Sequence, residues 1–191
     1  MKYKLKFEMV GGKYIDPKGL FFTAILPSSI TFYQLHQIIM LVTNYDDYHL
    51  WVFEFEKDYE IMLNAYYEES IKYYIPDGLN HLDAETTPIK DLFDKYKKAL
   101  YTYDFGDNNE FIIKLQKTPT KNIPYGVIKY NGPFPPDDIG GIGGYSRYLD
   151  YLEKGEDALE DELMFVEHFE SVINQEFNLE KVNKLINLII S

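Results

Sequence analysis

The sequence contains no cysteine and few basic residues. Among 191 residues, 31 aspartates and glutamates stand against 19 lysines and arginines, which gives a formal net charge of −12 at pH 7. The absence of cysteine excludes disulfide frameworks, thiol nucleophiles and zinc sites built on thiolates. A protein that binds duplex DNA needs a basic face to neutralise phosphates, so the shortage of lysine and arginine argues against direct duplex binding.

Long apolar runs are also absent. No stretch approaches the roughly 20 apolar residues of a membrane span, and residues 1–6 alternate between lysine and apolar residues, unlike the apolar core of a signal peptide. We therefore expect a cytoplasmic protein that does not associate with a membrane. Hydrophobic residues make up 46% of the chain and aromatic residues 17%, which is enough apolar surface to exclude disorder. The length fits one domain over residues 1–191.

The negative charge is concentrated near the C-terminus. Residues 150–176 contain one basic residue, Lys154, and ten acidic residues, and so hold nine of the twelve net negative charges. The ten are Asp150, Glu153, Glu156, Asp157, Glu160, Asp161, Glu162, Glu167, Glu170 and Glu176. Such a run is typical of the solvated face of a helix, and it also suits a docking surface for a basic protein partner.

Hydropathy periodicity predicts one α+β domain. Strands are expected at residues 3–9, 20–26, 49–55, 59–66, 101–105 and 110–117. A helix should begin after Thr31, because Gln34 completes a capping box with it. A second helix should begin at Thr87-Pro88 and extend its buried face to Leu100.

Other segments give weaker or different signals. Residues 67–87 are polar and lack a clear period, and residues 118–144, with five prolines and six glycines, are expected to form loops. The C-terminal third is expected to be helical: over residues 145–154, along an apolar stripe at 159–173, and after the capping residue Asn178.

The segment Tyr103-Asp104-Phe105-Gly106-Asp107 is the first candidate site. Two carboxylates three residues apart at a strand end can hold a cation or act as an acid/base pair. The same residues suit a hairpin connection in which both aspartates accept hydrogen bonds from backbone N–H groups. Both interpretations stay open at the level of sequence.

The second candidate is a loop rich in proline and glycine, Pro135-Pro136-Asp137-Asp138-Ile139-Gly140-Gly141-Ile142-Gly143-Gly144-Tyr145. Glycines before a helix can present N–H groups to an anion. No Gly-Lys-Ser/Thr follows, however, and two aspartates at the head of the loop would repel phosphate. A metal-binding or substrate-covering loop and a purely structural loop are the alternatives.

The four histidines do not have the paired spacing of a metal motif. His36 lies off the apolar stripe of its helix and is expected to be exposed. His168 lies among acidic residues and is expected to be a charged surface group. His81 falls in the segment without a clear period. His49, at the head of a predicted strand, is therefore the histidine that we select as a candidate site residue.

Taken in order, these segments resemble the plasmid pRiA4b ORF-3-like family. The matching residues are Leu35-His36, His49-Leu50 with Phe53, the Tyr103–Asp107 motif, the Pro135–Tyr145 loop and the tail Phe177-Asn178-Leu179-Glu180. The resemblance implies a roll-like α+β domain with a mixed sheet and a β-grasp-like strand–strand–helix–strand start. It marks Tyr103, Asp137, Asp138 and Tyr145 as candidate binding residues. It supplies no activity, because the family is functionally uncharacterised.

The chain departs from the family pattern at several places. Asn109 and Phe111 replace a tryptophan and a histidine that usually follow the Asp-Phe-Gly-Asp motif, and Trp51 replaces the second histidine of the His-Leu-His strand. The Trp-Arg pair expected near residues 20–23 is missing, and Asp137 stands where the family loop has glutamate. The chemistry that remains is carboxylate-rich, with His49 beside Asp104, Asp107, Asp137 and Asp138.

Three functions follow as hypotheses. The first is a non-enzymatic binding protein that docks a basic partner through residues 150–176, with no cofactor. The second is an enzyme or cation-binding domain that uses Asp104, Asp107, Asp137 and Asp138, with Asp104, Asp107 and His49 as catalytic candidates. Mg²⁺ or Ca²⁺ would suit its all-oxygen shell. The third is an acidic mimic of nucleic acid.

Overall fold

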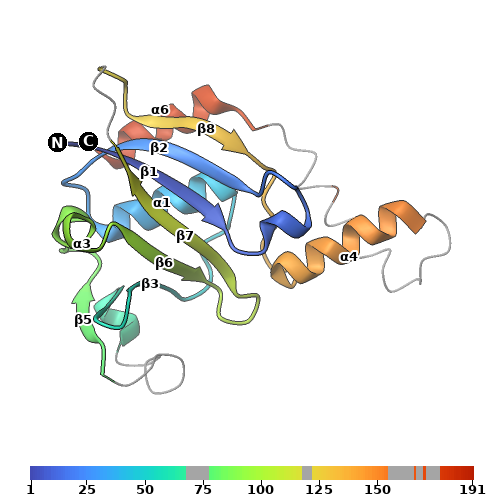
Figure 1. Cartoon of the computed structure of the whole chain (residues 1–191), viewed down its shortest axis with the longest axis horizontal. Coiled ribbons are helices and arrows are strands. Elements are labelled where there is room, and N and C mark those ends of the chain that lie inside the picture. Colours follow the sequence, from blue (N-terminus) through green and yellow to red (C-terminus); the bar gives the residue numbers. More distant parts are fainter. Residues whose placement is uncertain (68–77, 118–121, 155–165, 167–169, 171–176) are drawn as a thin grey trace.

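One mixed sheet, covered by helices on one face, organises the protein (Figure 1). The computed structural model describes residues 1–67, 78–117, 122–154, 166, 170 and 177–191. The strands are β1 (Lys2–Met9), β2 (Phe21–Pro27), β3 (Trp51–Phe55), β4 (Tyr59–Met62), β5 (Asn80–Asp83), β6 (Lys98–Tyr103), β7 (Asn109–Gln116) and β8 (Gly126–Asn131). The helices are α1 (Phe32–Thr43), α3 (Lys90–Tyr96), α4 (Gly141–Lys154), α6 (Leu179–Ile189) and the short 3-10 turn η1 (Gly12–Tyr14).

The eight strands follow the order β5-β4-β3-β6-β7-β1-β2-β8. Every neighbouring pair is antiparallel except β4 and β5, which are parallel, so the sheet is mixed. The chain starts with the predicted strand–strand–helix–strand sequence, β1-β2-α1-β3. The expected single-domain α+β fold is confirmed.

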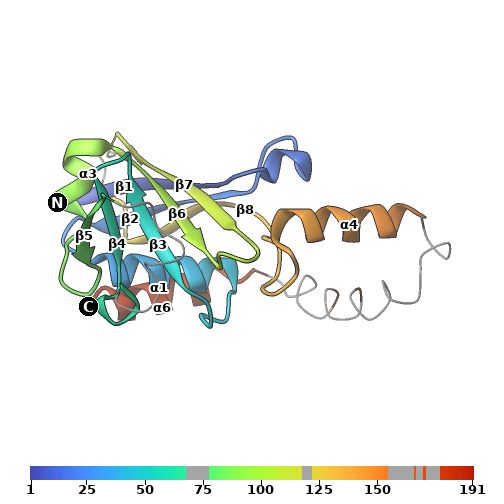
Figure 2. The same ribbon diagram turned by 90° about the horizontal axis from the view of Figure 1, so that it is seen from below.

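The sheet packs against its helical layer through every second side chain of its strands, as β1 illustrates. In β1, every second residue from Tyr3 to Met9 is buried, as the period-2 pattern predicts. Helix α1 lies across that face, with α6 beside it and along β8 (Figure 2). Thr31 caps α1 with the predicted capping box, and Asn178 caps α6 through the backbone N–H of Lys181. Helix α4 extends past the end of the sheet in both views.

Two predicted boundaries around α3 are wrong. The Thr87-Pro88 pair does not cap this helix, because the Thr87 carbonyl accepts the N–H of Phe32 and Pro88 forms an extended bridge with Thr31. The helix starts at Lys90 and ends at Tyr96. Lys97 follows in the left-handed region at φ 63°, so Leu100 belongs to β6 and not to the helix.

The expected loop 118–144 contains an additional strand, β8, and the start of α4. β8 is an edge strand that gains its order by pairing with β2. Its ends, Gly126 and Asn131, are residue types typical of turns, which hides the strand in the sequence. Val166 of the predicted apolar stripe at 159–173 is described and buried. The other residues of that stripe and most of the acidic segment 150–176 lie outside the described residues.

Candidate functional site

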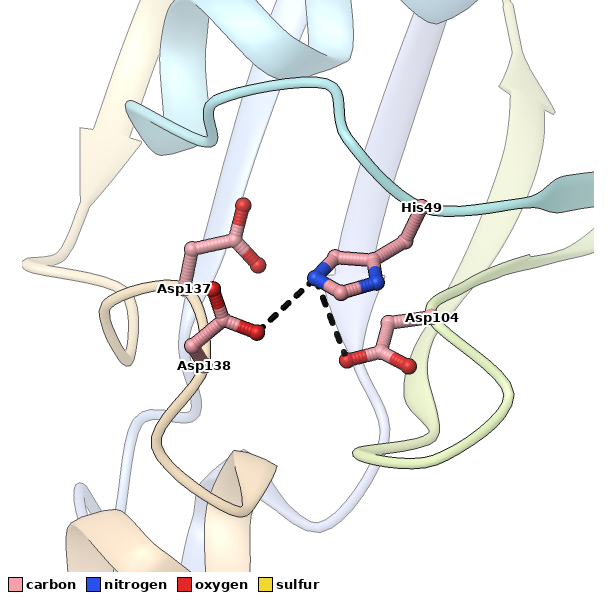
Figure 3. Close-up of side chains that lie close together, drawn as sticks. All are labelled: His49, Asp104, Asp137 and Asp138. Carbon is pink, nitrogen blue, oxygen red and sulfur yellow. Dashed lines mark hydrogen bonds and ion pairs between the residues drawn. The ribbon is translucent and has the colours of Figure 1, made fainter.

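Four side chains from three separate segments meet at the end of the sheet beside α4. His49 lies in the loop before β3, Asp104 follows β6, and Asp137 and Asp138 lie in the loop before α4 (Figure 3). Each residue offers one potential ligand atom, and these atoms all lie within 4.8 Å of one another. We call this group the His49 cluster.

The imidazole of His49 points its Nε2 atom at the carboxylates. Nε2 lies 2.8 Å from Oδ1 of Asp138 and 3.8 Å from Oδ2 of Asp104. The ring also packs edge-on against Tyr103, with ring centroids 5.7 Å apart. Partial burial opposes the charged imidazolium, but the negative field of Asp104 and the hydrogen bond to Asp138 outweigh it, so the pKa of His49 is raised. The predicted strand 49–55 begins at Trp51, which leaves His49 in a loop.

Asp104 ends its strand in a left-handed turn. Its φ of 55° turns the chain, and its Oδ1 atom accepts the backbone N–H of Gly106 at 2.8 Å. The other carboxylate oxygen, Oδ2, faces His49. Asp104 therefore combines both roles that its sequence suggested, since one oxygen orders the hairpin and the other belongs to the cluster.

Asp137 is buried, with 8% of its surface exposed. Its Oδ2 atom accepts the hydroxyl of Tyr103 at 2.8 Å and the backbone N–H of Asp46 at 3.0 Å. Its Oδ1 atom is also buried, yet it has no hydrogen-bond partner among the described residues. Burial raises the pKa of Asp137, against the two hydrogen bonds and the nearby His49, which lower it.

Asp138 forms the exposed side of the cluster. Its side chain is 65% exposed, against 30% for His49 and 12% for Asp104. Its φ of 58° lies in the left-handed region, where the backbone turns the carboxylate toward Nε2 of His49. The cluster therefore has a buried side, formed by Asp104 and Asp137, and a side that opens to solvent at Asp138.

Asp107, which the sequence suggested as a ligand, lies outside the His49 cluster and contacts the backbone instead. Its Oδ2 atom accepts three backbone N–H groups, those of Ile139, Gly140 and Gly141, at 2.7–3.1 Å. It thus fastens the 135–145 loop to the β6–β7 turn and supplies negative charge at the start of α4. Gly141 makes this close approach feasible, because a Cβ there would collide with the carbonyl oxygen of Asp107. Asp107 is not a member of the His49 cluster.

Tyr103 supports the cluster, whereas Tyr145 lies elsewhere. The Tyr103 hydroxyl holds Asp137 and accepts the backbone N–H of Tyr48 at 3.3 Å. Burial, followed by the bond to Asp137, raises the pKa of Tyr103. Tyr145 is buried in α4, where its ring is parallel to that of Tyr148.

The sequence did not indicate two buried polar groups near the cluster. The hydroxyl of Tyr45 and the carboxamide of Asn109 are buried without a hydrogen-bond partner among the described residues. The Tyr45 ring stacks on Tyr103, and Asn109 is the cross-strand neighbour of Tyr103 in β7. No local pattern distinguishes either residue, although Asn109 is a position at which the chain departs from the family.

The prediction for His36 is wrong. The side chain is fully buried, stacks on Trp51 with centroids 4.1 Å apart, and hydrogen-bonds Tyr101 at 2.8 Å and Asp47 at 2.7 Å. Burial lowers its pKa against the opposing effect of Asp47. His36 lies off the apolar stripe but still faces the sheet, because aromatic side chains cover this part of the helix and the ring nitrogens find polar partners. His81 lies on β5, and His168 lies outside the described residues.

The fold and cluster define a single-domain α+β protein in which loops at one sheet end gather a histidine and three aspartates. Among the described residues, no helix is both long enough and apolar enough to cross a bilayer. A family model for the plasmid pRiA4b ORF-3-like protein matches residues 20–184. The chain therefore belongs to the plasmid pRiA4b ORF-3-like family, which confirms the resemblance seen in its sequence.

Two relatives illustrate how far this similarity extends. The uncharacterized protein y4hQ of Sinorhizobium fredii (strain NBRC 101917 / NGR234) is 24% identical over 135 residues, which cover 67% of this chain and 63% of that protein. The crystal structure of a protein of unknown function, MM3350 from Methanosarcina mazei Go1, superposes with a TM-score of 0.67 at 26% identity. The superposition covers 93% of this chain and 91% of that one, and neither name states an activity.

Proposed function

We propose that this protein binds a divalent cation at the His49 cluster. The observation that carries the proposal is the Oδ1 atom of Asp137, a buried carboxylate oxygen that has no hydrogen-bond partner among the described residues. Leaving a buried charged oxygen unpaired is costly, and such groups in proteins are normally paired or bound to metal. A cation between His49 and the carboxylates would satisfy it.

The geometry supports this proposal. For the two aspartate motifs to share one ion, the 135–145 loop must fold over the 104–107 turn. Asp107 holds them together through three hydrogen bonds, and the ligand atoms of the His49 cluster lie within 4.8 Å of one another. Coordination bonds of about 2.0–2.6 Å then need only small side-chain movements.

The solvent-facing side also favours a site at which a ligand can exchange. The protein offers four donor atoms, and Asp138 stands at the exposed edge. An ion that takes more than four ligands would keep a position there for water or a substrate oxygen, and such an open position distinguishes catalytic from structural metal sites. We therefore prefer a cation-dependent enzyme to a purely structural ion site.

Equilibrium dialysis of the full chain tests the proposal after treatment with a chelator. The wild-type protein should bind one divalent ion per chain, and Asp137→Asn should lose most of that binding. Asp91→Asn, which changes an exposed aspartate of α3, is the matched control and should bind like the wild type. Equal binding by the Asp137 and Asp91 variants would refute the proposal.

The acidic segment supports a second proposal, docking of a basic protein partner. Nine of the twelve net negative charges lie in residues 150–176. This segment starts within the last turns of helix α4, which extends beyond the sheet (Figure 2). The remaining residues are nearly balanced in charge, so the His49 cluster and the acidic segment can serve different ligands. A cytoplasmic location stays a prediction.

A further inference from the structure

The three carboxylates of the His49 cluster each have one oxygen available to a cation. In Asp104, Oδ1 accepts the N–H of Gly106, so Oδ2 faces the cluster. In Asp137, Oδ2 is held by two donors, whereas Oδ1 has no hydrogen-bond partner in the part of the chain that the structure describes. Bidentate coordination by either residue would break hydrogen bonds that order the two loops.

Asp138 presents Oδ1, at 2.8 Å from Nε2 of His49. The protein therefore supplies one imidazole nitrogen and three monodentate carboxylate oxygens. In a four- or five-coordinate site, an ion with bonds of about 2.1 Å places neighbouring donors about 3.0–3.6 Å apart. The separations of 2.8 and 3.8 Å from Nε2 lie just below and just above that spacing, so small side-chain movements would bring the donors to it.

This donor set discriminates between classes of cation. Ca²⁺ takes about six to eight oxygen ligands, and Mg²⁺ prefers oxygen ligands and keeps several waters. Four donors that include an imidazole nitrogen suit neither ion well. Imidazole favours first-row transition metals such as Fe²⁺, Co²⁺ and Zn²⁺, and a five-coordinate ion of this kind would take the four protein donors and one water.

We propose that the site selects a first-row transition-metal dication over Mg²⁺ and Ca²⁺, and that Nε2 of His49 is the donor responsible for the selection. This inference rests on the proposed function and narrows it to one class of cation. That class replaces the Mg²⁺ or Ca²⁺ that an all-carboxylate motif would suggest. His49 is suited to this role because Tyr103 packs against its ring and orients it toward the carboxylates.

The experiment titrates the full chain with Co²⁺ and follows the visible absorption bands of the bound ion. Mg²⁺ and Ca²⁺ then compete with Co²⁺ for the site. The wild-type protein should bind Co²⁺ on the order of 100-fold more tightly than Mg²⁺, since imidazole favours the transition metal. The band intensity should be that of a four- or five-coordinate ion, which absorbs more strongly than a six-coordinate one.

Two histidine variants test whether His49 is responsible for the preference for Co²⁺ over Mg²⁺. His49→Asn should weaken Co²⁺ binding by on the order of 100-fold and leave Mg²⁺ binding nearly unchanged, so the selectivity collapses. His81→Asn is the matched control, because His81 lies on β5 outside the His49 cluster, and it should keep the wild-type preference. The wild-type preference is itself a test that does not depend on the folding of either variant.

The outcomes separate the two proposals. If Mg²⁺ or Ca²⁺ binds the wild type as tightly as Co²⁺, and Asp137→Asn abolishes that binding, the selectivity is refuted and the cation site stands. If His49→Asn folds and keeps the wild-type preference, the role of His49 is refuted. If no divalent ion binds at all, the proposed function fails together with this inference.

Discussion

Two clusters in this protein each combine one histidine with carboxylates, but only one of them brings its ligand atoms to a common point. The His49 cluster lies on loops, whereas Glu54, Glu60 and His81, here called the strand cluster, lie on β3, β4 and β5. In the strand cluster, Glu54 and Glu60 are cross-strand partners, and His81 stands beside Glu60 in the parallel pair. No group of three metal-ligating atoms forms there among the described residues.

The difference comes from the backbone that carries the side chains. Neighbouring strands fix side chains at a spacing of about 5 Å and keep them parallel, so carboxylates stand side by side. In the strand cluster, Nδ1 of His81 is 3.9 Å from Oε1 of Glu60, too far for a hydrogen bond. Left-handed loop residues such as Asp104 and Asp138 turn their carboxylates toward a common point. Loops can therefore bring donor atoms together at one point, whereas the strands here place two like charges side by side, with Glu60 buried and Glu54 half-buried.

The largest expected effect follows from Asp107→Ala, which removes the contact that brings the loops of the His49 cluster together. Three backbone N–H groups lose their acceptor, so stability should fall by about 2–4 kcal/mol. Cation binding should weaken as well. Urea unfolding and dialysis measure both, with Asp91→Ala as control. Loss of stability with unchanged cation binding would show that the loops converge without Asp107.

A smaller loss is expected from Tyr103→Phe, which tests whether one hydroxyl orients the buried carboxylate. Oδ2 of Asp137 would keep only the N–H of Asp46, so stability should fall by about 1–2 kcal/mol and cation affinity by roughly tenfold. Tyr14→Phe is the control, because that side chain is 89% exposed. An unchanged cation affinity would mean that the buried side of the His49 cluster orders itself without Tyr103.

In the strand cluster, replacement of Glu60 by glutamine should stabilise the protein. Burial, aided by the charge of Glu54, raises the pKa of Glu60 above its ordinary value of 4.5, and Oε2 has no partner among the described residues. A raised carboxyl pKa means that the folded state holds the proton more tightly. The stability that Glu60 contributes by holding this proton is therefore fully present below the ordinary pKa, and it is lost as the pH rises through the raised pKa.

Glu60→Gln removes this charge, so it should raise stability at pH 8 by on the order of 1 kcal/mol and flatten the decline of stability with rising pH. Unfolding free energies measured from pH 4 to pH 8 check this, with the exposed Glu85→Gln as control. A parallel decline in wild type and Glu60→Gln would show that the strand cluster is not a source of pH sensitivity.

The smallest effect on stability is expected from reversing charges in the acidic segment. Changing Glu160, Asp161 and Glu162 to lysine, in a run that the sequence predicts to be solvated, should alter the free energy of unfolding by less than about 0.5 kcal/mol. The same change should remove capture of basic proteins in a pull-down and leave cation binding at the His49 cluster intact. Unchanged capture would leave the segment as a solvated charge run and contradict the docking proposal.

Local pattern predicted most of the framework. Alternation in β1, the capping box at Thr31 and the cap at Asn178 are local features, because they depend on residues within a few positions of one another. The predictions were wrong where contacts with residues distant in sequence determine the local structure. Pairing with β2 orders β8, and the bridge between Thr31 and Pro88 displaces the start of α3.

The candidate site divides in the same way. The residue types and the family motifs singled out Asp104, Asp107, Asp137, Asp138 and His49. They did not show that Asp107 would be occupied by backbone N–H groups while His49 joined the other three. A carboxylate in a turn can accept backbone N–H groups or face other ligand atoms, and the segment that folds against it decides which of these occurs.

The sequence by itself determined the general character of this protein: a cysteine-free, acidic α+β chain with its negative charge near one end and two aspartate motifs, each close to glycine. Those properties depend on residue types and local periods. The tertiary structure alone decided that Asp137 is buried with one oxygen unpartnered among the described residues, that His36 is in the core and that His49 faces three carboxylates. The segments that meet there are some 30 to 90 residues apart, and packing, not local propensity, brings such segments together.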